Sequence, residues 1–306
     1  MQTTLLTHCS ISGIGLHSGK PVRLRLKPAA AGTGIVFRRV DVEAGARDIP
    51  VRPDLWVEAS LCTVLQNEHG ARVTTIEHLM AALHGCGVHN VIVEIDAEEV
   101  PILDGSAAPF VRKIMAAGIA TLAVPLTVLR MRKTIEVEKD GARAQLGPAP
   151  RLELAFEIDF ADPAIGHQRQ QFDMSNGAFL REVSDCRTFC MRRDVERMQA
   201  MGLALGGTLD NAVVFHDGKV LSPGGLRRAD EPVRHKLLDA MGDLYVAGLP
   251  ILGRYEGYRA GHALTGRLLQ AVFADPTAYE RVTVTATQRN HLPGTGISMA
   301  DLPLSA

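Results

Sequence analysis

Apolar residues recur with helical spacing at four places along the chain. In one of them, Leu237, Met241 and Leu244 fall on a single side, which would hold the helix against a core. Another begins at a threonine and stops at Gly85, and both residue types are usual at helix ends. We therefore predict helices over residues 75–83, 106–116, 232–246 and 263–272.

Short apolar or alternating runs lie between the predicted helices. Leu154, Phe156 and Ile158 occupy every second position of one run, which is the period of a strand. The run at 90–95 is almost continuously apolar and is typical of a buried strand. We predict strands over residues 22–26, 90–95, 152–158 and 251–255.

The order of these elements suggests a duplication. Aligning His78 with His235 superposes the helix–strand–helix runs of the two halves, although similarity between the halves is too weak to establish this alone. Both histidines then lie near the start of equivalent helices. We expect an α+β fold of two similar layered α/β sandwich domains, residues 1–124 and 125–306, facing each other with the active site between them.

Composition narrows the class of protein. The 306 residues are 46% hydrophobic and 22% charged, which is ordinary for a globular protein with an ample core. The net charge of -1 provides no general field for nucleic acid or an anionic membrane, so an anionic substrate must be met locally. We expect no nucleic-acid partner and no stable membrane insertion.

Cysteine usage and the apolar stretches point to a cytoplasmic protein. The five cysteines are an odd number without a C-x-x-C pair, which fits reduced thiols better than a disulfide framework. Residues 1–4 lack the features of a secretory signal, and polar residues and Pro125 interrupt the apolar stretch 116–129. We interpret that stretch as a helix end, a strand and the crossing between domains, and we expect a monomer.

Candidate chemistry begins on the predicted helix 232–246. His235 and Asp239 are four residues apart, about 6 Å along a helix, so both can reach one divalent ion. Asp243 lies about 12 Å from His235, which suits a supporting or catalytic carboxylate rather than a shared ligand. The alternative is a solvated helix face, the usual location for charges at this spacing.

A second acid–histidine pair, Glu77 and His78, lies at the start of the helix at 75–83. Thr74 and Glu77 have the spacing of a capping box, which is the alternative to a catalytic role. The segment is not an H-E-x-x-H motif, because His78 and His84 are six residues apart. Only the two helices together supply two histidines, one aspartate and an open fourth position, as a catalytic zinc requires.

His262 opens a third candidate segment. A single histidine is more often structural than catalytic. Near a carboxylate such as Asp243 its pKa would rise, which suits it to act as a charged acid.

These segments, in this order, resemble a known family. Together with 13–19, 102–110 and 187–189, they are similar to UDP-3-O-acyl-N-acetylglucosamine deacetylases, the zinc enzymes of lipid A biosynthesis in Gram-negative bacteria. The resemblance runs from about Leu6 to about Val272, and several motifs in one order are more specific than any single one. It implies the two-domain layered fold expected above. It also implies hydrolysis of the substrate to acetate and UDP-3-O-acyl-glucosamine, the committed step of the pathway.

The resemblance also implies roles for individual residues. Glu77 would be the general base, and His262, held charged by Asp243, would stabilise the oxyanion or protonate the leaving amine. Thr188 would donate its hydroxyl to the tetrahedral oxygen. One catalytic Zn²⁺ per chain, or Fe²⁺, which suits the same donors, would be bound by His78, His235 and Asp239.

Substrate contacts follow from the same resemblance. Lys236 would lie near the diphosphate, unless it is a surface cation, and Phe160 and Asp194 near the nucleotide. The apolar, glycine-rich run 201–210 would help to wall a passage for the acyl chain. His17 and Leu61 would be peripheral. Phe189 would also contact the substrate. We place four further substrate-binding side chains at the passage, with plain core packing as the alternative: Met191, Val195, Leu209 and Val214.

Two other functions remain open. One is a zinc amidohydrolase acting on a different N-acylated substrate, such as a peptide or another amino sugar. The other is a non-catalytic sugar-nucleotide-binding protein of the same fold. The second would be expected to have lost a ligand or the base, and all of them are present.

Overall fold

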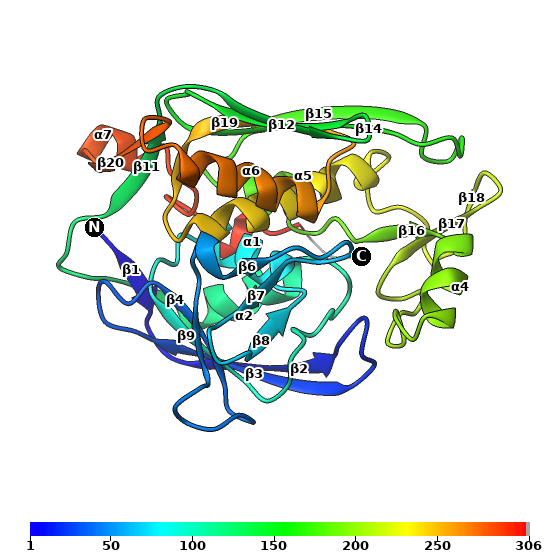
Figure 1. Ribbon diagram of the computed structural model, residues 1–306, viewed down its shortest axis with the longest axis horizontal. Coiled ribbons are helices and arrows are strands. Elements are labelled where there is room, and N and C mark those ends of the chain that lie inside the picture. The colour runs from blue at the N-terminus through cyan, green and yellow to red at the C-terminus, as the bar shows by residue number, and fades with distance from the viewer. Residues whose placement is uncertain (304–306) are drawn as a thin grey trace.

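The computed structural model describes residues 1–303, whose two largest β-sheets have helices between them. Figure 1 shows one sheet on each outer side, with α1 and α2 over the N-terminal sheet and α5 and α6 over the C-terminal one. The helices of the two halves therefore face each other. The expected α+β fold with two layered halves is confirmed.

The N-terminal sheet has five strands in the order β2-β3-β9-β4-β5, all antiparallel except the β4–β9 pair. Alternation in β3 buries Val22, Leu24 and Leu26 and exposes the residues between them, so one face is left to solvent. Helices α1 (Glu77–Gly85) and α2 (Ala108–Ala117) cover the other face. The strands are β2 (Cys9–Ile14), β3 (Pro21–Pro28), β4 (Ile35–Arg39), β5 (Asp48–Pro50) and β9 (Val91–Ile95).

The C-terminal sheet has seven strands. Its central strand β19 (Ile251–Tyr258) pairs in parallel with β11 and β14 and antiparallel with β13. Helices α5 (Glu231–Leu244) and α6 (His262–Ala274) pack on its inner face. The other strands are β11 (Thr127–Met131), β12 (Ile135–Lys139), β13 (Ala142–Gly147), β14 (Leu152–Asp159), β15 (His167–Asp173) and β20 (Tyr279–Thr283).

Smaller elements complete the two halves. Strands β6 (Trp56–Val57), β7 (Val64–Gln66) and β8 (Arg72–Thr74) lead into α1, and β1 (Thr3–Leu5) pairs with β10 (Ile119–Thr121). Strands β16 (Phe189–Met191), β17 (Val213–His216) and β18 (Lys219–Val220) project to one side with α4 (Arg192–Ala200). The remaining short helices are α3 (Ala178–Glu182), α7 (Ala286–Arg289), η1 (Pro53–Leu55), η2 (Tyr245–Ala247) and η3 (Met299–Asp301).

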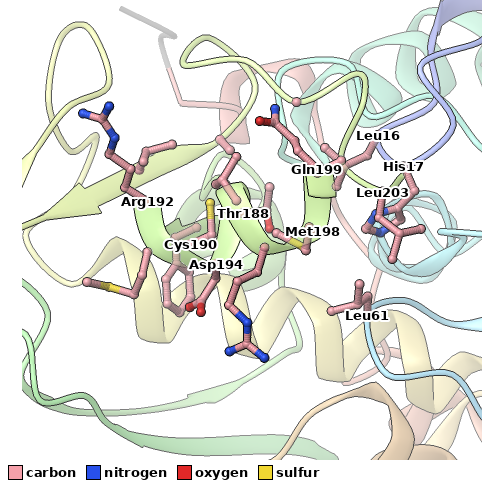
Figure 2. A pocket seen from close by; sticks show the side chains of 18 of the residues that line it. Leu16, His17, Leu61, Thr188, Cys190, Arg192, Asp194, Met198, Gln199 and Leu203 are labelled. Atoms are coloured by element: carbon pink, nitrogen blue, oxygen red, sulfur yellow. The ribbon is translucent and has the colours of Figure 1, made fainter. Parts of the chain in front are cut away.

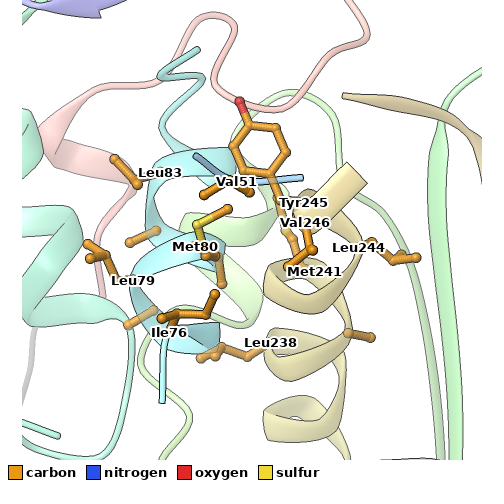
Figure 3. Packing of buried hydrophobic residues seen from close by; sticks show 14 of the residues in the cluster. Val51, Ile76, Leu79, Met80, Leu83, Leu238, Met241, Leu244, Tyr245 and Val246 are labelled. Carbon is orange, nitrogen blue, oxygen red and sulfur yellow. The ribbon is translucent and has the colours of Figure 1, made fainter. Parts of the chain in front are cut away.

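Close packing of α1 against α5 brings the two predicted halves of the site together. At Gly242 a Cβ atom would lie 2.0 Å from the carbonyl oxygen of Glu77, so only glycine permits this approach. The Tyr245 hydroxyl donates to the carbonyl of Val88 at 2.8 Å. Figure 3 shows Met80 and Met241 within the apolar cluster between the two helices, which run in the same direction. The first turn of α1 therefore lies beside the middle and later turns of α5.

The predicted helices and strands are present, with ends displaced by a few residues. Helix α1 begins at Glu77 rather than Thr75, because Thr75 has a φ of 57° and cannot be helical. The capping-box interpretation of Thr74 and Glu77 is wrong, since the residue before the helix is Ile76 and no side chain caps it. The carboxylate of Glu77 is thereby left for other contacts.

The two sheets draw their strands from separate parts of the chain, residues 9–95 and 127–283. The stretch 116–129 contains the end of α2, strand β10 and the start of β11, as predicted. We keep a division at residue 124 as a proposal. Among residues 1–303, none of the helices combines the length and the apolar character needed to cross a bilayer.

Candidate active site

The first turn of α1 and the middle of α5 bring His78, His235 and Asp239 together. One ligand atom from each lies within 4.8 Å of the others. The two imidazoles meet edge to face with ring centroids 5.0 Å apart, and their Nε2 atoms lie 3.6 and 3.2 Å from Oδ1 of Asp239. None of the three residues is more than 5% exposed.

The donors in this cluster fit a divalent cation. Nδ1 of His235 lies 3.0 Å from the carbonyl oxygen of Cys186, which can only accept, so Nδ1 carries the proton. The lone pair on Nε2 is then directed at Asp239, whose Oδ1 is buried and accepts no hydrogen bond from the described residues. Two acceptors facing each other in a buried space are stabilised by a cation between them, and two imidazoles with a carboxylate suit zinc or iron.

A second buried cluster contains Glu77, Asp243 and His262, with donor atoms again within 4.8 Å. Nδ1 of His262 lies 3.0 and 3.1 Å from the two oxygens of Asp243. The Thr63 hydroxyl donates to Asp243 at 2.5 Å, and the Thr63 backbone N–H donates to Glu77 at 2.9 Å. The Nε2 atom of His262 is 3.8 Å from Asp239, so the two clusters adjoin.

Burial and charge separate the pKa values of Glu77 and His262. Burial raises the pKa of Glu77 to about 7, aided by the carboxylates of Asp243 and Asp239 and opposed by His262. Burial alone would lower the pKa of His262, but Asp243, Glu77 and Asp239 outweigh it and raise the pKa to about 9. A carboxylate that can accept a proton therefore lies beside a protonated imidazole near neutral pH.

Lys236 is not a free surface cation. Its side chain is 16% exposed, and its Nζ donates to Oδ2 of Asp239 at 2.7 Å. The ammonium also lies 5.9 Å from the ring centre of Phe156. Burial alone would lower the pKa of Lys236, but the carboxylates of Asp239, Asp243 and Glu77 outweigh it and raise the pKa, so the group stays charged beside the clusters.

A cavity of about 1110 Å³ opens above the two clusters. His235, Lys236, Asp239 and His262 reach its inner end, whereas α4 and the segment after it form a wall. Figure 2 shows Thr188, Asp194 and His17 directed toward this space from different elements. Every predicted substrate-binding side chain lines it, as do Thr188, predicted to be catalytic, and the peripheral His17 and Leu61. The substrate-binding set is Phe160, Phe189, Met191, Asp194, Val195, Leu209, Val214 and Lys236.

The wall residues differ in how far they belong to the core. Leu209 is 42% exposed and Val195 is partly buried, whereas the partly buried Met191 packs against the hydrophobic core. Val214 is 6% exposed and also belongs to strand β17, so it serves both the core and the wall.

Some residues of the site gave no signal in the sequence. Thr63 joins Glu77 to Asp243, yet it lies 14 residues from one and 180 from the other, in no recognisable motif. A second cavity of about 310 Å³ adjoins His262, and its lining contains three cations, Lys139, Arg259 and Arg267, and one anion, Asp140. These cations come from separate elements, so only the fold brings them together.

Comparisons with known proteins agree with one another. The family model for UDP-3-O-acyl N-acetylglycosamine deacetylase matches residues 2–274. The chain is 46% identical over 289 residues to a protein of Photobacterium profundum named UDP-3-O-acyl-N-acetylglucosamine deacetylase, covering 94% of this chain and 95% of that one. Proteins of the same name from Vibrio parahaemolyticus and Shewanella violacea are 47% and 46% identical over 284 residues, covering 92% of this chain and 93% and 92% of theirs.

Proposed function

Because this chain belongs to the UDP-3-O-acyl N-acetylglycosamine deacetylase family, we propose that it removes the acetyl group from UDP-3-O-acyl-N-acetylglucosamine in a metal-dependent hydrolysis. The products are acetate and UDP-3-O-acyl-glucosamine, and the reaction is the committed step of lipid A biosynthesis. One observation carries this proposal: two buried clusters, one suited to a metal and one to proton transfer, adjoin at the inner end of a single cavity. We also propose a cytoplasmic monomer.

Residues His78, His235 and Asp239 would bind one zinc ion, and iron(II) suits the same donors. A divalent ion, when bound, polarises an amide carbonyl and makes water more acidic. The protein supplies the geometry, since the three ligands come from two helices locked together at Gly242.

The other cluster would move the protons. With a pKa of about 7, Glu77 takes a proton from the water that attacks the acetyl carbon. Protonated His262 stabilises the developing negative oxygen or donates to the amine nitrogen as the C–N bond breaks. Asp243 holds His262 charged, and the Thr188 hydroxyl at the cavity wall donates to the same oxygen.

The two cavities suggest where each end of the substrate lies. Lys236 stays a proposed substrate contact, but it is engaged by Asp239, so the smaller cavity is better placed for the diphosphate. Arg259 there is exposed and forms no ion pair with the described residues. Phe160 and Asp194 remain proposed contacts of the nucleotide. The acyl chain would extend along the wall past Met191, Val195, Leu209 and Val214.

A comparison of substrates tests the proposal. We expect acetate release from UDP-3-O-acyl-N-acetylglucosamine and much less from N-acetylglucosamine or an N-acetylated peptide. Efficient turnover of the simple substrates would favour a general amidohydrolase. Tight binding of the nucleotide substrate without turnover, by protein that contains metal, would favour the non-catalytic alternative.

A further inference from the structure

Helix α5 holds one peptide group from both sides. The group is the peptide bond between Cys186 and Arg187, in the segment that leads to Thr188 and strand β16. Its carbonyl oxygen lies 3.0 Å from Nδ1 of His235, and its N–H donates to Oε1 of Glu231 at 2.9 Å. Glu231 and His235 are four residues apart and so share one face of α5.

Glu231 is itself fixed in position. It is completely buried and accepts two hydrogen bonds from the Arg187 guanidinium, at 2.9 and 3.1 Å. The backbone N–H groups of Arg187 and Arg227 donate to it at 2.9 and 2.7 Å. Arg187 also donates to the carbonyl of Gly225. With four donors on one buried carboxylate, Glu231 cannot turn without leaving a charge unpaired.

The planar peptide transmits this constraint to the metal-binding cluster. A peptide group is rigid, so fixing its N–H also fixes the direction of its carbonyl. That carbonyl requires a proton on Nδ1 of His235 and leaves the Nε2 lone pair toward Asp239, 3.2 Å away. Successive hydrogen bonds through one polar group also polarise each other.

From this geometry we propose that Glu231 is a positioning residue for the metal site. Acting through the Cys186–Arg187 peptide, it fixes the ring orientation and the tautomer of His235 and so strengthens binding of a divalent ion. The inference rests on the proposed metal site and deepens it. A carboxylate that contacts a histidine ligand directly is a familiar arrangement, and here a peptide group lies between the two.

The same segment carries a side chain of the cavity. Thr188 follows the held peptide, and its N–H donates to the carbonyl of Gly105 at 2.8 Å. Gly105 has a φ of 83°, and a Cβ atom there would lie 2.1 Å from the carbonyl oxygen of Asn211. The segment is therefore fixed at both ends, at Glu231 and at Gly105, with Thr188 facing the cavity between them.

The test compares zinc affinity in two variants that each weaken an arginine–carboxylate pair, which is buried at Glu231 and more exposed at Asp41. Glu231→Gln keeps the size of the side chain but removes its charge. The new amide NH₂ group would face N–H groups of Arg187 and Arg227, which donate to Glu231 in the wild type. The matched control is Asp41→Asn, because Arg39 forms the same two-bonded pair with Asp41, at 2.8 and 2.7 Å, and also donates to the carbonyl of Arg72. That pair lies at the N-terminal sheet, away from the cavity.

Zinc dissociation constants come from competition with a coloured chelator. Ring ¹⁵N NMR of metal-free protein gives the tautomer of His235. We expect Glu231→Gln to bind zinc about 10–100-fold more weakly and to lose the uniform Nδ1–H tautomer, with Asp41→Asn matching the wild type in both. Unchanged affinity and tautomer in Glu231→Gln would overturn the proposal, as would an equal loss in Asp41→Asn.

Arg187→Lys covers the case in which Glu231→Gln does not fold. It keeps the positive charge, Glu231 and the peptide N–H, so the tautomer and the zinc affinity should stay near those of the wild type despite a less stable pair. Loss of both would contradict the proposal that Glu231 acts on His235 through the Cys186–Arg187 peptide group. Wild-type protein that binds no zinc would refute the proposed function, whereas the tautomer in metal-free protein would still decide whether Glu231 orients His235.

Discussion

The inner end of the large cavity and its α4 wall are built in opposite ways. The inner end, which we call the floor, consists of the two buried clusters on α1, α5 and α6. The wall consists of α4 and residues 201–210. Helix α4 has no buried residue, and Met201 and Leu205 beside it are 65% and 57% exposed.

The difference shows which part of the site the core of the protein controls. A floor residue cannot move without disturbing α1 against α5, where even a methyl group at Gly242 has no space. A wall residue has few neighbours to displace, so it can change with little cost to the fold. We infer that the floor determines the reaction and that the wall determines how well an acyl chain fits.

The largest effect should come from Glu77→Gln on the floor. The variant keeps the acceptor for the Thr63 N–H but cannot take a proton, so kcat should fall by about 10²–10⁴-fold. Steady-state kinetics with zinc analysis measures this, because the metal ligands are untouched and the zinc content should equal that of the wild type. Near-normal kcat with full zinc would remove Glu77 from the mechanism.

The pH profile should then distinguish the base from the acid. Activity needs ionised Glu77, so it should fall as the pH drops through about 7, and protonated His262, so it should fall as the pH rises through about 9. Asp243→Asn removes the main carboxylate that raises the pKa of His262. The alkaline limb should move to lower pH, with kcat reduced about 10–100-fold. An unmoved alkaline limb would contradict the role given to His262.

Gly242→Ala should disturb the floor without changing any of its polar groups. The added methyl would lie 2.0 Å from the carbonyl of Glu77 and 3.1 Å from the nitrogen of Ala81, which must push α1 away from α5. We expect a loss of about 1–3 kcal/mol in the free energy of unfolding and weaker zinc binding. Gly261→Ala, where a methyl group meets open space, is the control in urea denaturation. Equal stability of the two variants would contradict tight packing at the floor.

The smallest effect is expected from Leu209→Ala on the wall. Because Leu209 is 42% exposed, truncation should raise KM for a long-chain substrate only about two- to fivefold and leave kcat unchanged. A substrate with a short acyl group should show no change. A large loss of kcat would mean that the wall takes part in the reaction, and the contrast with the floor would fail.

Residues of the site that share one helix could be predicted from the sequence. His235 and Asp239 were predictable because a four-residue spacing on a helix fixes their neighbourhood before any tertiary structure is known. His78 lies on a different helix. The ligand count of a catalytic zinc suggested combining the two helices, and the resemblance to a family then assigned His78 to the set. The helices themselves were predictable from apolar spacing, apart from their ends.

Contacts between distant segments were not predictable from local pattern. Thr63 and the cations at the smaller cavity are brought in by strand and loop packing, which has no local signature. The spacing of Thr74 and Glu77 suggested a capping box, but Thr75 has a left-handed backbone conformation, and the helix begins at Glu77 without a side-chain cap. Lys236 donates to the buried Asp239, a contact that its position beside His235 on a polar helix face did not predict.

The central claim is that His235 binds a catalytic metal ion at the floor. The most direct test measures zinc content and acetate release from UDP-3-O-acyl-N-acetylglucosamine for the wild type and for His235→Ala. We predict about one ion per chain and acetate release for the wild type, and loss of both in the variant. Wild-type protein that releases acetate without bound metal, or a His235→Ala variant that keeps metal and activity, would contradict the account.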